Sequence, residues 1–394
     1  MDTLTDSRAR TGITTEATSR DCGVLTAGPS TSVHRHTHAP SMLGRIAVYG
    51  AVLCSLLSGW ATSASASSPS VGIGLGLFAS EPEWDYGPLI DEIATLGVDG
   101  VLLVVPWYQK DVRATLIRPR PGFSPSLATV KRTLEQLDAK GLEATVMPIV
   151  LLQEQDHPRQ WRGVIAPEEE GKPAVARWFR SYQDFLLAHA ALAAQTGAER
   201  LIVGSELLSM EGEKAQWLDL IARTRQLFDG ELIYSANWDQ YDRVTFWEAL
   251  DAIGVNGYFR LAQDGAEPTG DELVAAWERP LEGLRKLRAD VGLPLLITEV
   301  GYSSRETAAA KPWCACAAEA IDHELQSRLY SALMRVFVHE ELSKAGAASL
   351  PFDRWFLWNW FGRGGREDGT FSPRGKPAEV VLRRALEERK TQGQ

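Results

Sequence analysis

Short apolar runs alternate with amphipathic segments along most of this chain. The runs lie at residues 71–78, 100–106, 143–151, 200–205, 232–236, 252–256, 295–298 and 355–358, and such continuous runs are typical of parallel strands covered on both faces. The segments between and after them predict helices at residues 89–96, 127–140, 174–196, 215–228, 244–250, 272–291, 319–345 and 378–389. Gly97, Gly141, Gly197, Gly230 and Gly292 follow five of these segments, where a left-handed residue commonly ends a helix.

Eight strand–helix pairs predict a single (β/α)8 barrel, the simplest closed topology for this alternation. A doubly wound open sheet is the structural alternative, and it usually carries a glycine-rich phosphate loop after its first strand. The glycines at residues 72–76 instead lie within the first predicted strand and open no helix. The composition, 44% hydrophobic and 23% charged, suits one large globular domain.

Two glutamates lie at the ends of buried runs. Glu206 closes the run 199–206, and Glu299 lies near the end of the run 293–302. An unpaired carboxylate is costly to bury, so a buried one is expected to have a function. The two lie about three strand–helix units apart in the sequence, which places them on strands 4 and 7 of the barrel. Both are then expected at the same rim, where barrel enzymes have their active sites.

Other polar and aromatic residues also follow the predicted strands. They are Trp107, Tyr108, Gln109, Gln153, Asn237, Trp238, Asp239, Asn256, Tyr258, Tyr302, Trp358, Asn359 and Trp360. Aromatic faces stack on pyranose rings, and amides and carboxylates bind hydroxyl groups, so this set favours a neutral sugar over a phosphate compound. Each tryptophan alone also fits a packing role at the rim, and Asn256 alone fits a turn.

The first 66 residues differ from the rest. Residues 42–66 combine a basic start, an apolar run and a small-residue end, which predicts a signal peptide cut after Ala66. Residues 1–41 are polar and are interpreted as a disordered extension or an upstream start, with Met42 as the natural one. The domain then spans 67–394, and the protein is expected to be secreted or periplasmic. A lipid anchor at Cys54 is the second choice, because Leu53 stands where a small residue is preferred.

Charge and cysteine content narrow the possible partners. The net charge of −10 disfavours binding to nucleic acid and to anionic membranes, and no stable membrane insertion is expected after signal cleavage. Cys314 and Cys316 remain in the mature chain, where they either oxidise or stay free thiols. Without nearby histidines they are weak evidence for zinc, so neither a metal nor another cofactor is expected.

Five stretches together resemble glycoside hydrolase family 113. They are residues 204–207 (GSEL), 234–239 (YSANWD), 246–259 (FWEALDAIGVNGYF), 297–302 (ITEVGY) and 371–378 (FSPRGKPA). The resemblance extends from about Gly72 to Leu386. That family belongs to a large clan of retaining (β/α)8 glycosidases with glutamates on strands 4 and 7, and its described members are mainly β-mannanases.

The resemblance implies specific roles. Glu206 would be the acid/base, Glu299 the nucleophile and Tyr258 the hydrogen-bond partner of the nucleophile. Many clan members have Asn directly before the acid/base, where this chain has Ser205, and that difference bears on the sugar in the reactive subsite. The expected substrate-binding residues are Trp107, Ser205, Asn237, Trp238, Asn256, Trp358 and Trp360.

The predicted function is a retaining hydrolase that cleaves a β-linked neutral polysaccharide or oligosaccharide, similar to β-1,4-mannan or an exopolysaccharide, by double displacement. In this mechanism one carboxylate attacks the anomeric carbon while the other protonates the leaving oxygen, with the two groups about 5 to 5.5 Å apart. The alternatives are a carbohydrate-binding barrel without catalysis and an accessory protein of polysaccharide export.

Overall fold

The computed structural model describes residues 68–157, 159–344 and 349–392, so the predicted signal segment lies outside it. Eight parallel strands form a closed barrel in the order β1-β10-β9-β8-β7-β6-β3-β2. They are β1 (Ser70–Gly76), β2 (Gly100–Gln109), β3 (Glu143–Leu152), β6 (Arg200–Ser205), β7 (Glu231–Ala236), β8 (Ala252–Asn256), β9 (Leu295–Val300) and β10 (Arg354–Leu357). The predicted (β/α)8 barrel is confirmed, with every strand close to its expected position.

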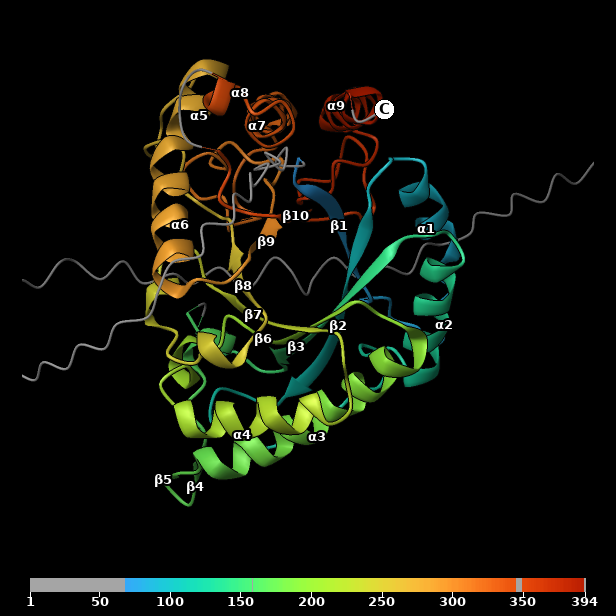
Figure 1. Cartoon of the computed structure of the whole chain (residues 1–394), viewed down its shortest axis with the longest axis vertical. Coiled ribbons are helices and arrows are strands. Elements are labelled where there is room, and N and C mark those ends of the chain that lie inside the picture. The colour runs from blue at the N-terminus through green and yellow to red at the C-terminus, as the bar shows by residue number, and fades with distance from the viewer. Residues whose placement is uncertain (1–67, 158, 345–348, 393–394) are drawn as a thin grey trace, which may run out of the picture. The chain divides into compact units, whose positions relative to one another are not determined.

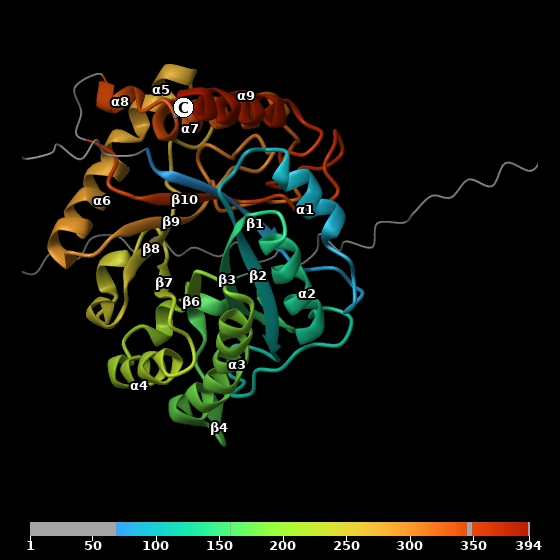
Figure 2. The same ribbon diagram turned by 45° about the vertical axis from the view of Figure 1, so that its right-hand side comes forward.

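Helices surround the barrel (Figures 1 and 2). They are α1 (Gly87–Ala94), α2 (Leu127–Asp138), α3 (Val175–Thr196), α4 (Lys214–Arg225), α5 (Gly270–Ala276), α6 (Glu278–Val291), α7 (His323–Phe337), α8 (Glu341–Lys344) and α9 (Pro377–Gln392). A short hairpin, β4 (Glu168–Glu169) with β5 (Lys172–Pro173), precedes α3. None of the described helices is both long enough and apolar enough to cross a membrane.

The sequence predicts one helix at 244–250, and this prediction is wrong. The structure has two 3-10 turns there, η4 (Tyr241–Arg243) and η5 (Trp247–Ala249). Phe246, between them, is fully buried and stacks on Trp217 of α4, with ring centroids 5.0 Å apart. A segment this short has little helical stability of its own, so the burial of Phe246 determines its conformation.

The predicted helix at 272–291 is broken in two at Trp277. Pro280 has no backbone N–H to donate to the carbonyl of Ala276, so the helical hydrogen bonding cannot continue there. Helix α7 begins at His323 and not at residue 319, because the Asp322 side chain caps it by accepting from the Leu325 N–H at 2.8 Å.

Four of the five helix-ending glycines have the expected left-handed backbone, and Gly230 does not. Gly230 has another reason to be glycine. A Cβ atom there would lie 2.6 Å from the carbonyl oxygen of Glu199, which accepts a hydrogen bond from Glu231 where β7 begins.

Most residues inside the strands are apolar, and almost all are buried, as the near-continuous runs imply. All eight strands run in the same direction, so their carboxyl ends meet at one rim of the barrel. Glu206 directly follows β6, and Glu299 lies in the last part of β9. The barrel therefore brings to one rim two residues that lie far apart in the sequence.

Candidate active site

Two buried glutamates occupy the carboxyl-end rim of the barrel. Glu206 is 7% exposed and Glu299 is 3% exposed. Strands β7 and β8 separate β6 from β9 in the barrel, so the glutamates extend from two sides of this part of the rim. The charge of Glu206 helps to raise the pKa of the Glu299 carboxyl.

The backbone at Glu206 is left-handed, with φ of 54°. Such a conformation costs a non-glycine residue about 1–3 kcal/mol, and it persists where the surroundings hold it. The Glu206 N–H donates to the carbonyl of Ser235 at 2.9 Å. Its carboxylate accepts from Nη2 of Arg162 at 2.6 Å and from Nδ2 of Asn256 at 2.8 Å. The turn thereby directs the carboxylate toward two fixed donors.

The amide of Asn256 is itself held in one orientation. Its oxygen accepts hydrogen bonds from the hydroxyls of Ser235 and Thr298, each at 2.8 Å. The Nδ2 group must therefore face Glu206. Asn256 orients this carboxylate from strand β8, which lies between the strands that carry the two glutamates.

Glu299 has a different environment. The hydroxyl of Tyr258 donates to its Oε2 at 2.7 Å. Burial, and then the charge of Glu206, raises the pKa of the Glu299 carboxyl, while Arg162 and the Tyr258 hydroxyl lower it. Arg162 and Tyr258 therefore favour the ionised form of Glu299, while burial and the charge of Glu206 oppose it.

A third buried carboxylate, Glu211, was not predicted from the sequence. It accepts from the hydroxyl of Tyr234 at 2.8 Å, and that hydroxyl accepts from the Leu207 N–H at 3.1 Å. Glu211 therefore supports the turn that carries Glu206. Burial raises the pKa of Glu211 to about 7, and the charge of Glu206 also raises it.

Several of the expected substrate-binding residues lie at this rim. Ser205 and Asn237 are almost fully buried, and the Asn237 amide donates to Asp239 at 2.7 Å. Trp358 is 8% exposed and packs edge-on against Phe361. A Cβ at Gly74 of β1 would lie 3.2 Å from the Trp358 ring, so the glycine makes room for it. Trp238 is partly buried and stacks on Trp313.

Trp107 has a packing role. Its ring lies 5.3 Å from that of Phe185 and 5.5 Å from that of His189, both on α3. It therefore fills the space between β2 and α3. The sequence placed it among the substrate-binding residues because it lies near a strand end, and the direction of its side chain could not be read there.

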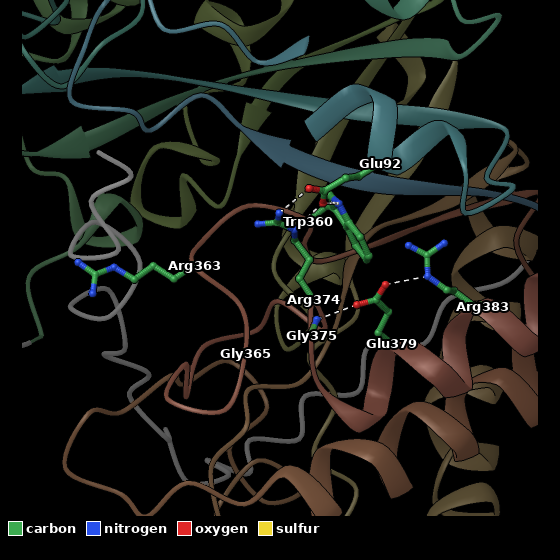
Figure 3. A pocket seen from close by; sticks show the side chains of 8 residues that line it. All are labelled: Glu92, Trp360, Arg363, Gly365, Arg374, Gly375, Glu379 and Arg383. Carbon is green, nitrogen blue, oxygen red and sulfur yellow. Dashed lines mark hydrogen bonds and ion pairs between the residues drawn. The ribbon is translucent and has the colours of Figure 1, made fainter. Parts of the chain in front are cut away.

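Trp360 faces α1. Its indole N–H donates to Glu92 at 3.0 Å, and the guanidinium groups of Arg374 and Arg383 lie over its ring. Figure 3 shows the pocket of about 300 Å³ that it lines with Glu92, Arg363, Gly365, Arg374, Gly375, Glu379 and Arg383. Arg374 forms two 2.8 Å bonds to Glu92, so Trp360 belongs to a salt-bridged contact between α1 and the chain after β10.

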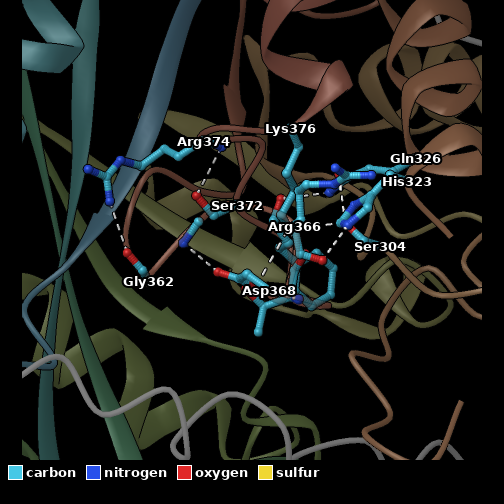
Figure 4. Close-up of polar contacts among 12 residues, drawn as sticks. Ser304, His323, Gln326, Gly362, Arg366, Asp368, Ser372, Arg374 and Lys376 are labelled. Carbon is cyan, nitrogen blue, oxygen red and sulfur yellow. Dashed lines mark hydrogen bonds and ion pairs between the residues drawn. The ribbon is translucent and has the colours of Figure 1, made fainter. Parts of the chain in front are cut away.

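A second polar network holds the segment after β10 in place (Figure 4). Lys376 Nζ donates to the Ser304 hydroxyl at 3.0 Å and lies 3.6 Å from Asp368. Ser304 donates to Gln326 at 2.7 Å, and the Gln326 amide donates to the carbonyl of Tyr302 at 2.9 Å. These bonds connect the segments that follow β9 and β10 at the rim.

Cys314 and Cys316 form a disulfide in the segment between β9 and α7. In the described part of the chain, His, Cys, Asp and Glu side chains form no group of three or more that could hold a metal ion.

The site can supply the acid–base and nucleophilic chemistry of two buried carboxylates that have different hydrogen-bond partners. Arg162 and Trp313 were missed by the sequence analysis because they lie in segments without apolar periodicity.

Comparison with known families gives one family match. The model of Glycoside Hydrolase Family 113 matches residues 87–363. No match was found among curated protein sequences.

Several solved structures share the fold. A GH113 β-mannanase from Alicyclobacillus acidocaldarius, in complex with ManMIm, is 26% identical, with a TM-score of 0.69 over 82% of this chain and 98% of the other. A GH113 β-1,4-mannanase has the same TM-score at 20% identity, over 81% of this chain and 99% of the other. A GH5_18 protein from Streptomyces cattleya, in complex with GlcNAc, is 16% identical, with a TM-score of 0.54 over 83% and 82% of the chains.

Proposed function

Because the chain belongs to glycoside hydrolase family 113, we propose that it is a retaining glycosidase that cleaves β-1,4-mannan-like polysaccharide or oligosaccharide by double displacement. The main observation is the unequal surroundings of the two buried glutamates. Glu299 accepts from the Tyr258 hydroxyl, and Glu206 accepts from Arg162 and Asn256. Such unlike environments suit one nucleophile and one acid/base.

The two carboxyls share one proton. With that proton on Glu206, the ionised Glu299 attacks the anomeric carbon in the first step. The Tyr258 hydroxyl holds Oε2 of Glu299, which leaves Oε1 to form the bond. Glu206 gives its proton to the glycosidic oxygen, and the leaving sugar departs. The sugar is then joined to Glu299 through an ester bond.

In the second step Glu206 acts as a base. Having given up its proton, it carries a negative charge, which Arg162 and Asn256 stabilise by donating to its two oxygens. Glu206 then takes a proton from water, and the water oxygen attacks the anomeric carbon and releases Glu299. Two displacements restore the original anomeric configuration. The Arg162–Glu206 pair thus matches the state of Glu206 that follows departure of the leaving group.

The proposed sugar contacts are Ser205, Asn237, Asn256, Trp238 and Trp358 at the same rim. The β-mannanase relative at 26% identity supports mannan as the first substrate to test. The test is product analysis after incubation with β-1,4-linked mannan, glucan and xylan oligosaccharides and with the producing organism's own exopolysaccharide. We expect the wild type to shorten mannan oligosaccharides and Glu299→Ala to leave them intact. Cleavage of another polymer alone would contradict the mannan assignment, and no cleavage at all would contradict the enzymatic function.

We also propose that the protein is exported and that its mature chain begins near Ser67. The support is the order of basic, apolar and small residues at 42–66. Amino-terminal sequencing of the protein recovered outside the cytoplasm is expected to begin near Ser67. Recovery of only the intact chain, starting at Met1, from the cytoplasm would contradict export.

A further inference from the structure

Two tryptophans from different segments of the rim stack on each other. The rings of Trp238 and Trp313 have centroids 5.2 Å apart and an interplanar angle of 12°. Trp238 follows β7, and Trp313 lies in the segment between β9 and α7. Both side chains are partly buried and pack against the core. Together they form an aromatic pair that is not fully covered by the protein.

Trp313 is held by the segment around it. Its neighbours Cys314 and Ala315 are each 1% exposed, and the disulfide to Cys316 fixes the turn. The Ser303 hydroxyl donates to the Cys314 carbonyl at 2.8 Å. Trp313 is the one large apolar residue in the mostly buried stretch 308–316, and its side chain keeps some exposed surface.

A second set of bonds fixes this segment to the chain that follows β8. The carbonyl of Ala309 accepts from the N–H groups of Leu261 and Ala262, at 2.9 Å and 3.1 Å. The guanidinium of Arg260 lies 5.4 Å from the centre of the Trp313 ring. Trp313 therefore reaches Trp238 from a preformed support, and little ordering is needed when a ligand binds.

Trp238 follows the strand that lies next to the one leading to Glu206. Strand β7 pairs directly with β6, and the Glu206 N–H bonds to the carbonyl of Ser235 on β7. Asp239, the residue after Trp238, is close enough to Glu206 for the charge of Glu206 to affect the pKa of its carboxyl. Partial desolvation raises the pKa of Asp239, and the charge of Glu206 is among the further causes.

We propose that Trp238 and Trp313 together form a subsite for the leaving-group sugar, a β-linked hexopyranose unit that stacks on the aromatic pair. This inference rests on the proposed function, in which Glu206 protonates the leaving oxygen. The sugar beyond that oxygen must lie on the Glu206 side. An indole face matches the apolar C–H face of a pyranose, and stacking on Trp313 holds the Trp238 ring rigid. Trp238 contacts the sugar through the face turned away from Trp313, and Trp313 holds the Trp238 ring in place.

The test compares two substrates with the same transferred sugar. One is β-1,4-mannotetraose, whose leaving group is a sugar, and the other is β-mannobiosyl fluoride, whose leaving group is fluoride. Trp313→Ala and Trp238→Ala are each expected to lower kcat/KM on mannotetraose about tenfold or more. On the fluoride the change is expected to stay within about twofold, because fluoride makes no stacking contact.

Two further variants control for effects on folding. Lys311→Ala changes a side chain on the same segment that forms a 3.7 Å ion pair with Asp264, and it is expected to leave activity on both substrates unaffected. Trp313→Phe keeps an aromatic face and is expected to recover most of the mannotetraose activity. Equal losses of Trp313→Ala and Trp238→Ala on both substrates, or no loss on either, would overturn the subsite.

Binding separates this inference from the proposed function. If the wild type cleaves neither substrate, the proposed function fails. Calorimetric titration of Glu299→Gln with β-1,4-mannohexaose measures binding without cleavage and therefore still tests the subsite. Adding Trp313→Ala to Glu299→Gln is expected to weaken binding about tenfold. Unchanged binding, or no binding by Glu299→Gln itself, would contradict the subsite.

Discussion

Arg162 donates from Nη2 to Oε2 of Glu206 at 2.6 Å, and their side chains are only 11% and 10% exposed. Arg162 begins the 3-10 turn η2 (Arg162–Val164) in the segment after β3. An ion pair this far from water is expensive to desolvate and adds little net stability by itself. Its value here is local, because it places a positive charge beside the two carboxylates that are proposed to carry out the chemistry.

Replacing Arg162 with Gln is expected to shift the pH dependence of activity. Arg162 lowers the pKa of Glu299, so its removal raises that pKa. The proposed nucleophile must be ionised to attack. The acid limb of the kcat/KM profile should therefore move to higher pH, with the loss of activity growing toward low pH. The measurement is a pH–rate profile of wild type and Arg162→Gln.

The matched control for this profile is Arg159→Gln, which removes an exposed arginine from the same segment. It should leave the acid limb in place. An acid limb that moves equally in both variants, or in neither, would contradict the proposed role of Arg162.

Replacing Glu299 with Gln is expected to stabilise the protein, and more so at high pH. Burial and the charge of Glu206 raise the pKa of Glu299 in the folded state above its ordinary value of 4.5. The folded chain therefore holds this proton more tightly than the unfolded chain. Wild-type stability should fall as pH rises from about 4.5 to the raised pKa, and the neutral amide avoids this loss.

Melting temperatures at pH 5 and pH 8 test this expectation. The gain of Glu299→Gln over the wild type should be larger at pH 8. The exposed Glu387→Gln serves as the control and should show no such difference. A gain that does not increase with pH would mean that the Glu299 pKa is not raised in the folded protein.

Lys376→Met is expected to destabilise the fold by about 3–5 kcal/mol, because it leaves the Asp368 carboxylate buried without its cation. The two side chains are 0% and 3% exposed. Urea unfolding measures the effect. Lys286→Met breaks an exposed pair with Asp290 on α6 and should have little effect. A loss no larger than that of the control would show that the Lys376 contact is not needed for stability.

The barrel could be predicted because its strands are buried on both faces. Continuous apolar runs located all eight, and the strand ends then indicated Glu206, Glu299, Asn256 and Tyr258. Helix boundaries were less certain. The break at Trp277 depends on a hydrogen bond that Pro280 cannot make, which the apolar periodicity of 272–291 does not show.

The sequence also did not show in which direction the side chains near strand ends point. Trp107 packs on α3 and Trp360 donates a hydrogen bond to Glu92 of α1, although both lie near strand ends as Trp238 does. Arg162, Glu211 and Trp313 reach the site only through the folding of loops. Glu211 is bonded to Tyr234, which lies 23 residues away in the sequence, and the sequence pattern does not indicate this contact.

Chemical rescue of the two glutamate variants tests the proposed mechanism most directly. Glu206→Ala should lose about a hundred- to ten-thousandfold on unactivated substrates. With an activated aryl β-glycoside it should still form the covalent intermediate, and azide should then speed turnover and give a glycosyl azide of retained configuration. Glu299→Ala should lose activity on every substrate and should not be rescued in this way. Rescue of Glu299→Ala but not Glu206→Ala, with an azide product of retained configuration, would reverse the two roles, and unchanged hydrolysis by both variants would contradict the catalytic assignment itself.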